Sequence, residues 1–210
     1  MAIVHPDAVL RPTKPELVHQ WLEAADWFDG DPGAVEVKPR FSYRFDDPAG
    51  RVGVETLVVR DGERFLQLPL TYREAPLDGA DLWLLTTMEH SVLGKRWIYD
   101  GVGDPVLVAA FIAAMVGGLP SAGLELETAG EHRAADTLIR AEGTGAGPAP
   151  VDVELVGVER SGSDSTVQTS RGALRIPHLL DPSARASGPA LLGRGDGFGT
   201  DVLLAKLTTV

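Results

Sequence analysis

Apolar residues recur every three or four positions between Lys14 and Ala25, which places them on one face of a helix. At the start of this stretch, Thr13 and Glu16 have the spacing of a capping box, in which each side chain bonds a backbone N–H near the other residue. Pro15 is compatible with the first turn of a helix. These signals predict an amphipathic helix over residues 14–25.

Runs of β-branched and aromatic residues follow, separated by short turn sequences. Asp61-Gly62 is a strong hairpin signal, and Pro69 indicates that its strand lies at an edge or contains a bulge. The Asp46-Asp47 turn could bind a hard cation, although aspartates in turns more often bond the local backbone. We therefore expect an antiparallel meander. Its three strands are expected at residues 37–45, 52–60 and 64–73.

The most apolar helix of the chain is expected after two further strands, at residues 82–92 and 95–100. Asp104 and Pro105 have the residue types of a helix N-cap and first helical position. The following residues, 106–116, are apolar nearly all round, so the helix should be covered on several sides. The Gly117-Gly118 pair then predicts its end.

Strand patterns separated by glycine replace the helical period after Pro120. We therefore expect an α+β unit over residues 1–119 and a small, mostly β unit over residues 120–210. Residues 143–150 have the composition of a flexible linker, and residues 183–199 are expected to form an exposed loop. In the second unit, strands are expected at residues 124–128, 137–141, 151–159, 165–170, 173–179 and 202–208. Residues 1–10 are expected to form a short edge strand or an extended arm.

Composition narrows the possible functions. The formal net charge of −11 disfavours sequence-independent binding to nucleic acid and binding to an anionic membrane surface. The chain contains no cysteine, which excludes disulfides, thiolate zinc sites and thiol catalysis. We see no signal peptide or membrane span, so a soluble, cytoplasmic protein is expected. The abundance of Ala, Gly, Asp and Arg suggests a GC-rich, actinobacterial source.

Three adjacent motifs resemble the N-terminal cap domain of actinobacterial maltokinases, the enzymes that phosphorylate maltose in the route from trehalose to glycogen. The resemblance implies a curved antiparallel sheet with two helices, of the cystatin-like type, which agrees with the helix, meander and helix expected from the residue pattern. The motifs are YRFDDP at residues 43–48, QLPLTYR at residues 67–73 and WIYDGVGDP at residues 97–105.

The second half resembles the nucleotide-facing hairpin and following strand of the kinase N-lobe, at residues 157–167 and 174–176. In that family the later strand carries a lysine that binds phosphate, and Arg175 stands at the matching position. A guanidinium is not a conservative replacement for a lysine in a tight phosphate site. The resemblance also covers only the non-catalytic half of a kinase, since the base and the magnesium ligands belong to a C-terminal lobe.

The small-residue segment at residues 161–165 is a candidate phosphate loop, since backbone N–H groups of such segments can bind phosphate. The alternative is a plain hairpin turn, which Gly, Ser and Asp favour without any ligand. Asp164 would in addition repel phosphate. The candidate residues are Ser161, Gly162, Ser163, Ser165 and Arg175.

A second candidate site, for a ligand or a partner, is the densest cluster of titratable and aromatic side chains. Glu89 and His90 could act as an acid and base pair, and Trp97 could stack on a sugar. However, neighbours along a strand point to opposite faces, so the structural alternative is a core or interface cluster in which Asp100 holds a turn or a helix start. The members are Glu89, His90, Arg96, Trp97, Tyr99 and Asp100.

The five histidines are scattered without the spacing of a metal site, so we expect no metal and no other cofactor. The tryptophans could line a sugar site but are expected to anchor the core. The expected function is a non-catalytic accessory protein that binds a glucan or a partner enzyme of trehalose, maltose and glycogen metabolism. The alternatives are the nucleotide-binding half of a sugar kinase completed in trans, and a small-molecule binder that uses the concave face of the sheet.

Overall fold

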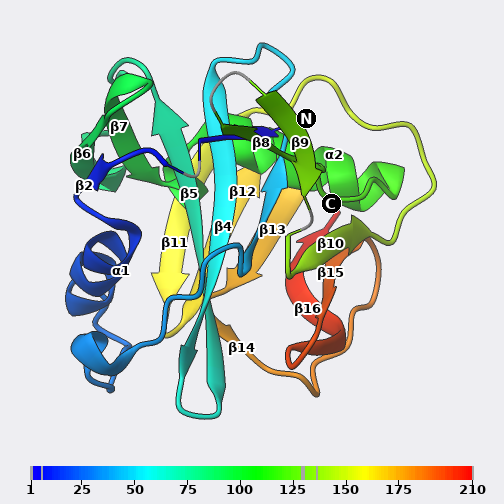
Figure 1. Cartoon of the computed structure of the whole chain (residues 1–210). Helices are drawn as coiled ribbons and strands as arrows, with labels where there is room; N and C mark the ends of the chain where they lie inside the picture. The colour runs from blue at the N-terminus through cyan, green and yellow to red at the C-terminus, as the bar shows by residue number, and fades with distance from the viewer. Residues whose placement is uncertain (1, 6, 129–130, 136, 210) are drawn as a thin grey trace.

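The computed structural model describes residues 2–5, 7–128, 131–135 and 137–209, which form two α-helices and three β-sheets, mostly antiparallel (Figure 1). The fold is therefore α+β with a curved sheet, as the sequence predicted. No helix in the described part of the chain is long and apolar enough to cross a membrane.

The first large sheet has seven strands and contains the predicted meander. Strands β4 (Val52–Asp61) and β5 (Arg64–Arg73) pair in unbroken register over their whole length. Gly62, in the turn between them, has a positive φ of 58°. The hairpin signal at Asp61-Gly62 is therefore confirmed. Along the sheet the order is β2 (Leu10–Arg11), β6 (Leu84–His90), β7 (Gly94–Asp100), β5 (Arg64–Arg73), β4 (Val52–Asp61) and β3 (Ser42–Phe45), with β14 (Leu179–Leu180) also on β5.

Pro69 lies in a central strand, which differs from the predicted edge or bulge. It pairs with Thr56 of β4 without a register shift. On the other side of β5, β7 pairs only with residues 70–73 and β14 only with residues 65–66. Pro69 thus falls between two short partners, where a missing N–H leaves no ladder bond unmade.

Helix α1 (Lys14–Glu23) forms where the apolar period predicted it. Thr13 and Glu16 make the complete capping box. The helix buries Leu17, Val18, Trp21 and Leu22, which pack with apolar residues of β4, β5, β6 and β7 in one core cluster. This helix therefore covers one face of the seven-stranded sheet.

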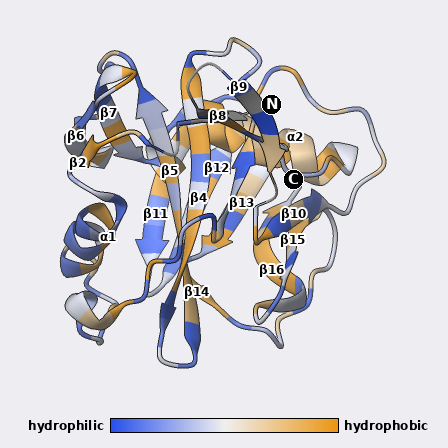
Figure 2. Cartoon of the chain, viewed as in Figure 1, coloured by the Kyte–Doolittle hydropathy of each residue, from blue (hydrophilic) through white to orange (hydrophobic). Residues whose placement is uncertain are grey.

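Helix α2 (Pro105–Gly117) begins at the predicted Asp104 cap, whose side chain accepts a hydrogen bond from the N–H of Val106. It ends at Gly118 in the left-handed conformation, with a φ of 65°. The helix packs against strands of both large sheets, and Figure 2 shows hydrophobic residues along α2 and β4. The apolar residues all round this helix predicted that it would be covered on several sides, and this prediction is confirmed.

The second half of the chain builds a six-stranded sheet and most of a three-stranded one. In the smaller sheet β1 is an edge strand that pairs in parallel with β8. The six-stranded order is β10 (Arg140–Gly143), β15 (Ala190–Gly195), β16 (Gly199–Thr208), β13 (Gly172–Pro177), β12 (Asp164–Thr169) and β11 (Leu155–Ser161); the smaller order is β1 (Ala2–Val4), β8 (Leu124–Thr128) and β9 (Glu131–Ala135).

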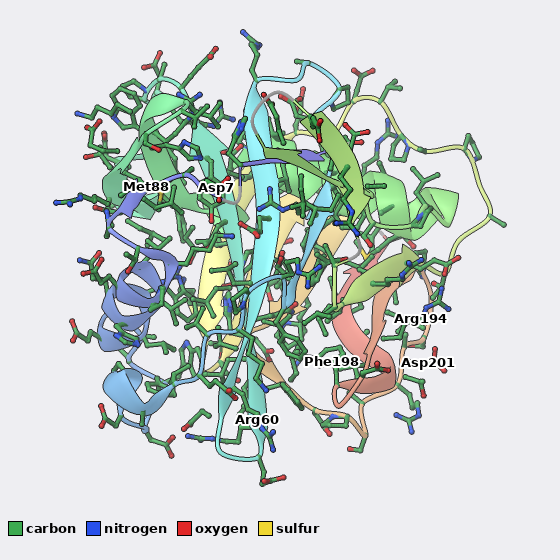
Figure 3. All side chains as sticks on the ribbon, viewed as in Figure 1. Asp7, Arg60, Met88, Arg194, Phe198 and Asp201 are labelled. Atoms are coloured by element: carbon green, nitrogen blue, oxygen red, sulfur yellow. The ribbon has the colours of Figure 1, made fainter. Side chains whose placement is uncertain are left out.

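The prediction of an exposed loop at residues 183–199 is wrong for the second half of this range, which contains strand β15. Ala190, Leu191 and Phe198 are buried there, and Phe198 is labelled in Figure 3. The glycines that suggested a loop serve close packing instead. A Cβ at Gly193 would lie 2.9 Å from side-chain carbons of Leu204 and Phe198.

The flexible linker predicted at residues 143–150 is in fact fastened to the end of α2. The N–H groups of Gly145 and Gly147 bond the carbonyls of Met115 and Val116 at 2.8 and 3.0 Å. These carbonyls lie in the last turn of the helix and have no partner within it. Small residues are required because a Cβ on Gly145 would lie 2.1 Å from the carbonyl oxygen of Val116.

The larger core cluster draws side chains from both sides of residue 119. Val58 and Phe111 from the first half share it with Leu174, Leu191 and Leu204 from the second. Strands of both halves therefore pack against α2, and the three together form one hydrophobic core cluster. A division into units 1–119 and 120–210 remains a prediction of the sequence.

Candidate functional site

A pocket of about 490 Å³ lies where the two halves of the chain meet, and we call it the indole pocket. Its walls come from the end of α1 and the turn after it, from the start of β6, from the end of β7, and from the β11–β12 hairpin. Its lining residues are Gln20, Trp21, Ala24, Ala25, Asp26, Trp27, Leu82, Leu84, Leu85, Asp100, Arg160, Gly162, Asp164 and His178.

Asp100 is the buried anion of this pocket, with 1% of its surface exposed. It ends β7 and begins a short 3-10 helix, where its Oδ1 accepts a hydrogen bond from the N–H of Val102 at 3.2 Å. Its Oδ2 accepts from Nε1 of Trp21 at 2.9 Å and from Nη2 of Arg160 at 2.6 Å. The sequence predicted a turn or helix-entry role for Asp100, which is confirmed, but the two long-range donors were not foreseen.

Arg160 brings a positive charge to the pocket from β11. Its guanidinium lies 5.0 Å from the ring centroid of Trp83, a cation–π distance. The side chain is 47% exposed. In the part of the chain that the structure describes, Nε and Nη1 have no hydrogen-bond partner, so these two donors remain available to a ligand.

His178 forms the buried floor of the pocket. Its Nδ1 lies 3.1 Å from the carbonyl of Gln67 and its Nε2 lies 2.8 Å from Oγ of Ser165. A carbonyl can only accept, so Nδ1 carries the proton and Nε2 accepts from the Ser165 hydroxyl. Burial lowers the pKa of His178 and so favours this neutral form, although the nearby Asp100 carboxylate opposes the shift.

Two indole rings hold this histidine in place. Trp27 stacks on the imidazole with ring centroids 6.2 Å apart and planes 12° from parallel, and Trp21 contacts it at 5.0 Å. Ser165 is fully buried and lies outside the pocket lining, so the Ser165–His178 pair has the geometry of a packing contact and not of an accessible nucleophile.

The candidate phosphate loop does not come together around one point. Gly162 and Ser163 form the two-residue turn between β11 and β12, with Gly162 at a φ of 54°, so the hairpin interpretation is confirmed. Ser165 points to His178, and Nε of Arg175 bonds Oδ2 of Asp164 at 3.0 Å. Of the predicted phosphate-loop residues, only Gly162 lines the indole pocket.

The candidate cluster at residues 89–100 is divided between different surroundings. Asp100 lies in the indole pocket, and Tyr99 is buried with its hydroxyl accepting from the N–H of Leu77 at 2.8 Å. Trp97 is half-buried beneath Lys95, whose Nζ lies 5.0 Å from the ring. Glu89 is exposed and faces Lys95 across the β6–β7 hairpin.

His90 and Arg96 line a second pocket of about 750 Å³ on the face of the first sheet that α1 covers. His90 accepts hydrogen bonds at Nδ1 from the N–H groups of Val92 and Leu93, and burial together with the charge of Arg96 lowers its pKa. Met88, labelled in Figure 3, also lines this pocket.

The second pocket contains a buried carboxylate, Glu55, that the sequence analysis did not single out. Lys14 Nζ and Arg44 Nη2 lie 2.8 and 2.7 Å from its Oε1, and the Tyr72 hydroxyl donates to Oε2 at 3.1 Å. Burial opposes ionisation, but the two cations outweigh it and lower the pKa of Glu55 to about 2. Glu55 is thus a buried anion whose negative charge is neutralised by Lys14 and Arg44.

The residues that sequence reasoning missed at the indole pocket are Arg160, His178 and the pairing of Trp21 with Trp27. No local spacing links them, since 79 positions separate Trp21 from Asp100 and 60 separate Asp100 from Arg160. The tryptophans were considered as a sugar-lining set: Trp21 and Trp27 do line the pocket, Trp83 contacts Arg160, and Trp97 lies elsewhere. Among the described residues, no group of three or more His, Cys, Asp or Glu side chains could hold a metal ion.

Comparison with known proteins gives a family-model match that includes part of this site. No curated protein matches the chain. The family model of the maltokinase N-terminal cap domain matches residues 21–104, a stretch that contains Trp21 and Asp100 but ends before Arg160 and His178. Over residues 21–104, therefore, the chain resembles the maltokinase N-terminal cap domain, as its three sequence motifs predicted.

Proposed function

We propose that this protein is a non-catalytic accessory protein related to the N-terminal region of maltokinases. It binds a glucan or a partner enzyme of trehalose, maltose and glycogen metabolism, in the cytoplasm of an actinobacterial cell. The observation that carries the proposal is the match of residues 21–104 to the maltokinase N-terminal cap domain. In this proposal the first sheet and α1 correspond to the cystatin-like cap, and strands β11 to β13 to the hairpin of a kinase N-lobe.

The contacts of the second half support a non-catalytic role. Arg175, which the proposed correspondence matches to the phosphate-binding lysine, is engaged by the carboxylate of Asp164. A nucleotide phosphate would have to compete with that carboxylate for the same guanidinium, and would meet its negative charge. The hydroxyl of Ser165 is likewise committed to His178.

The purified chain of 210 residues offers a direct test. We expect it to sediment with glycogen, or to be retained by purified enzymes of the trehalose and glycogen pathways. With maltose and magnesium-ATP it should form no maltose phosphate, and millimolar magnesium-ATP should leave its melting temperature unchanged. Retention by neither glycogen nor those enzymes would overturn the proposal. Phosphate transfer, alone or with an added kinase lobe, would establish the rival function of a sugar-kinase half.

A second candidate function, binding of a small molecule on the sheet, is favoured by the 750 Å³ pocket beside Glu55. Its lining combines Arg51 and Arg96 with Glu74, which suits a ligand that bears both charges. Thermal shift with zwitterionic metabolites tests this function. A shift that persists in Arg160→Gln but disappears in Arg96→Gln would assign the ligand to this pocket.

A further inference from the structure

We propose that the indole pocket binds a neutral saccharide unit. Its hydroxyl groups bond to Gln20, Asp26 and Arg160, and its C–H faces pack against Trp27, Leu84 and Leu85. This inference rests on the proposed function and deepens it, because it assigns the glucan to one site. The site joins residues from inside the maltokinase-like segment to residues beyond it.

Charge disfavours anionic ligands. The pocket contains one ion pair between Asp100 and Arg160 and borders a second between Asp164 and Arg175. Asp26 adds an exposed carboxylate at the rim. An anion would be repelled by Asp26 and Asp164, and Arg160 is the one cation among the described residues of the lining that would attract it. A neutral ligand with many polar groups avoids this repulsion.

Donors and acceptors without a partner among the described residues come to the pocket lining from several elements. In the described part of the chain, the side chains of Gln20 and Asp26 make no hydrogen bond, and Arg160 retains Nε and Nη1. Oδ1 of Asp164 is also without a partner there, since Arg175 bonds Oδ2. A guanidinium only donates, a carboxylate only accepts and an amide does both. Hydroxyl groups, which donate and accept, can satisfy all of them at once.

Apolar surface supplies the remaining contact area. Trp27, Leu84 and Leu85 line the pocket. Leu82 at the rim is 95% exposed, which is unusual for so large an apolar side chain. The volume of about 490 Å³ lies within the range of about 300–1,000 Å³ that small-molecule sites occupy. Indole faces and aliphatic groups of this kind pack against the C–H face of a sugar ring.

Arg160 and Trp27 are held in place before any ligand arrives. Asp100 fixes one end of Arg160 with a 2.6 Å hydrogen bond, and Trp83 lies against the guanidinium. Trp27 is stacked on His178, which is itself bonded on both ring nitrogens. Side chains fixed in this way lose little conformational entropy on binding, so modest contacts with them can give measurable affinity.

Isothermal titration of the full chain with maltose and maltotriose tests the site. We expect Gln20→Ala and Asp26→Asn, both at exposed positions, to weaken maltotriose binding about 2–10-fold each. The first removes the hydrogen bonds of the amide, and the second removes the charge and replaces one accepting oxygen by a donor. Trp27→Ala should weaken it by about tenfold or more. Glu63→Gln, an amide substitution at a 96% exposed hairpin residue far from the pocket, is the matched control and should bind as the native chain does. The melting temperature of each variant establishes that it is folded.

Parallel sedimentation with glycogen separates this inference from the function on which it rests. Loss of glycogen retention in Gln20→Ala and Asp26→Asn, but not in Glu63→Gln, supports both. Retention of glycogen by all four proteins, or the absence of heat with maltotriose when glycogen is retained, overturns the indole pocket and leaves the accessory function standing. Failure of the native chain with maltotriose, glycogen and the pathway enzymes overturns both.

Discussion

The guanidinium of Arg160 donates a 2.6 Å hydrogen bond to the carboxylate of Asp100 across 60 residues of sequence. Asp100 is almost fully buried, whereas Arg160 is about half exposed. The pair therefore ties the β11–β12 hairpin to the end of β7, and it closes one side of the indole pocket at the same time.

Removing the cation alone should destabilise the protein. Arg160→Gln leaves Asp100 buried with only two donors, which we expect to cost about 2–3 kcal/mol of unfolding free energy. This is less than the roughly 3–5 kcal/mol of a fully buried pair, because water reaches Arg160. Urea unfolding measures the change. The double variant Arg160→Gln with Asp100→Asn should recover part of the loss, and a cycle with no coupling between the two sites would contradict this account.

Protonation of His178 should weaken the fold below neutral pH. Burial lowers the pKa of the folded histidine, so the unfolded chain, with an ordinary pKa of about 6.5, binds the proton more tightly. The stability from the neutral ring is thus complete above about pH 6.5 and is lost as the pH falls through the folded pKa. Melting curves between pH 5 and 8 should show this slope.

The matching variant is His178→Gln, which should be less stable at pH 8 but should show a flatter dependence between pH 5 and 8. His19→Gln, on the outer part of α1, should retain the native slope. Equal slopes in all three proteins would assign the pH dependence to other groups.

Glu55 should be the most sensitive charge in the second pocket. Glu55→Gln leaves Lys14 and Arg44 facing one another without a counter-ion, for an expected loss of about 3–5 kcal/mol. Because the folded pKa of about 2 lies below the usual value of 4.5, the stabilisation is complete above about pH 4.5 and falls as the pH drops toward 2. Unfolding at pH 7 and pH 3 should differ less in the variant than in the native chain.

The fastening of residues 143–150 to α2 predicts different outcomes at two neighbouring glycines. Gly145→Ala places a methyl group 2.1 Å from the carbonyl oxygen of Val116, so the backbone must move, at about 1–3 kcal/mol. Gly147→Ala meets its nearest atoms only at 3.7 Å and should cost at most about 0.5 kcal/mol. Denaturant midpoints compare the two. Equal stability would show that the segment yields without strain.

Elements specified by neighbouring residues could be predicted from the sequence. Thr13 with Glu16, Asp61 with Gly62, and Asp104 with Pro105 each determine local backbone geometry, and the structure contains the helix start or hairpin that each pair predicted. Glycines led to a wrong loop prediction where their role is to allow close packing inside a strand. Gly193 allows close approach inside β15, and its local sequence looks the same as that of a loop.

The candidate site could be predicted only in part, for the same physical reason. Asp100 was identified because a cap is local, whereas its partners Trp21 and Arg160 come from other elements that only the complete topology brings near. His178 carries no local signal, because its neighbours Ser165 and Gln67 meet it through strand register in two different sheets.

The position of helix α2 determines which segment of this protein can bury its own core. The stretch that matches the model of the maltokinase N-terminal cap domain ends at Asp104, the residue before the helix begins. Taken alone, that stretch would present Tyr43, Phe45 and Val54 to water, since α2 and the second sheet cover them. The segment that matches the family model is thus smaller than the segment of this chain that buries its own core, so residues 21–104 would need a cover from elsewhere to fold.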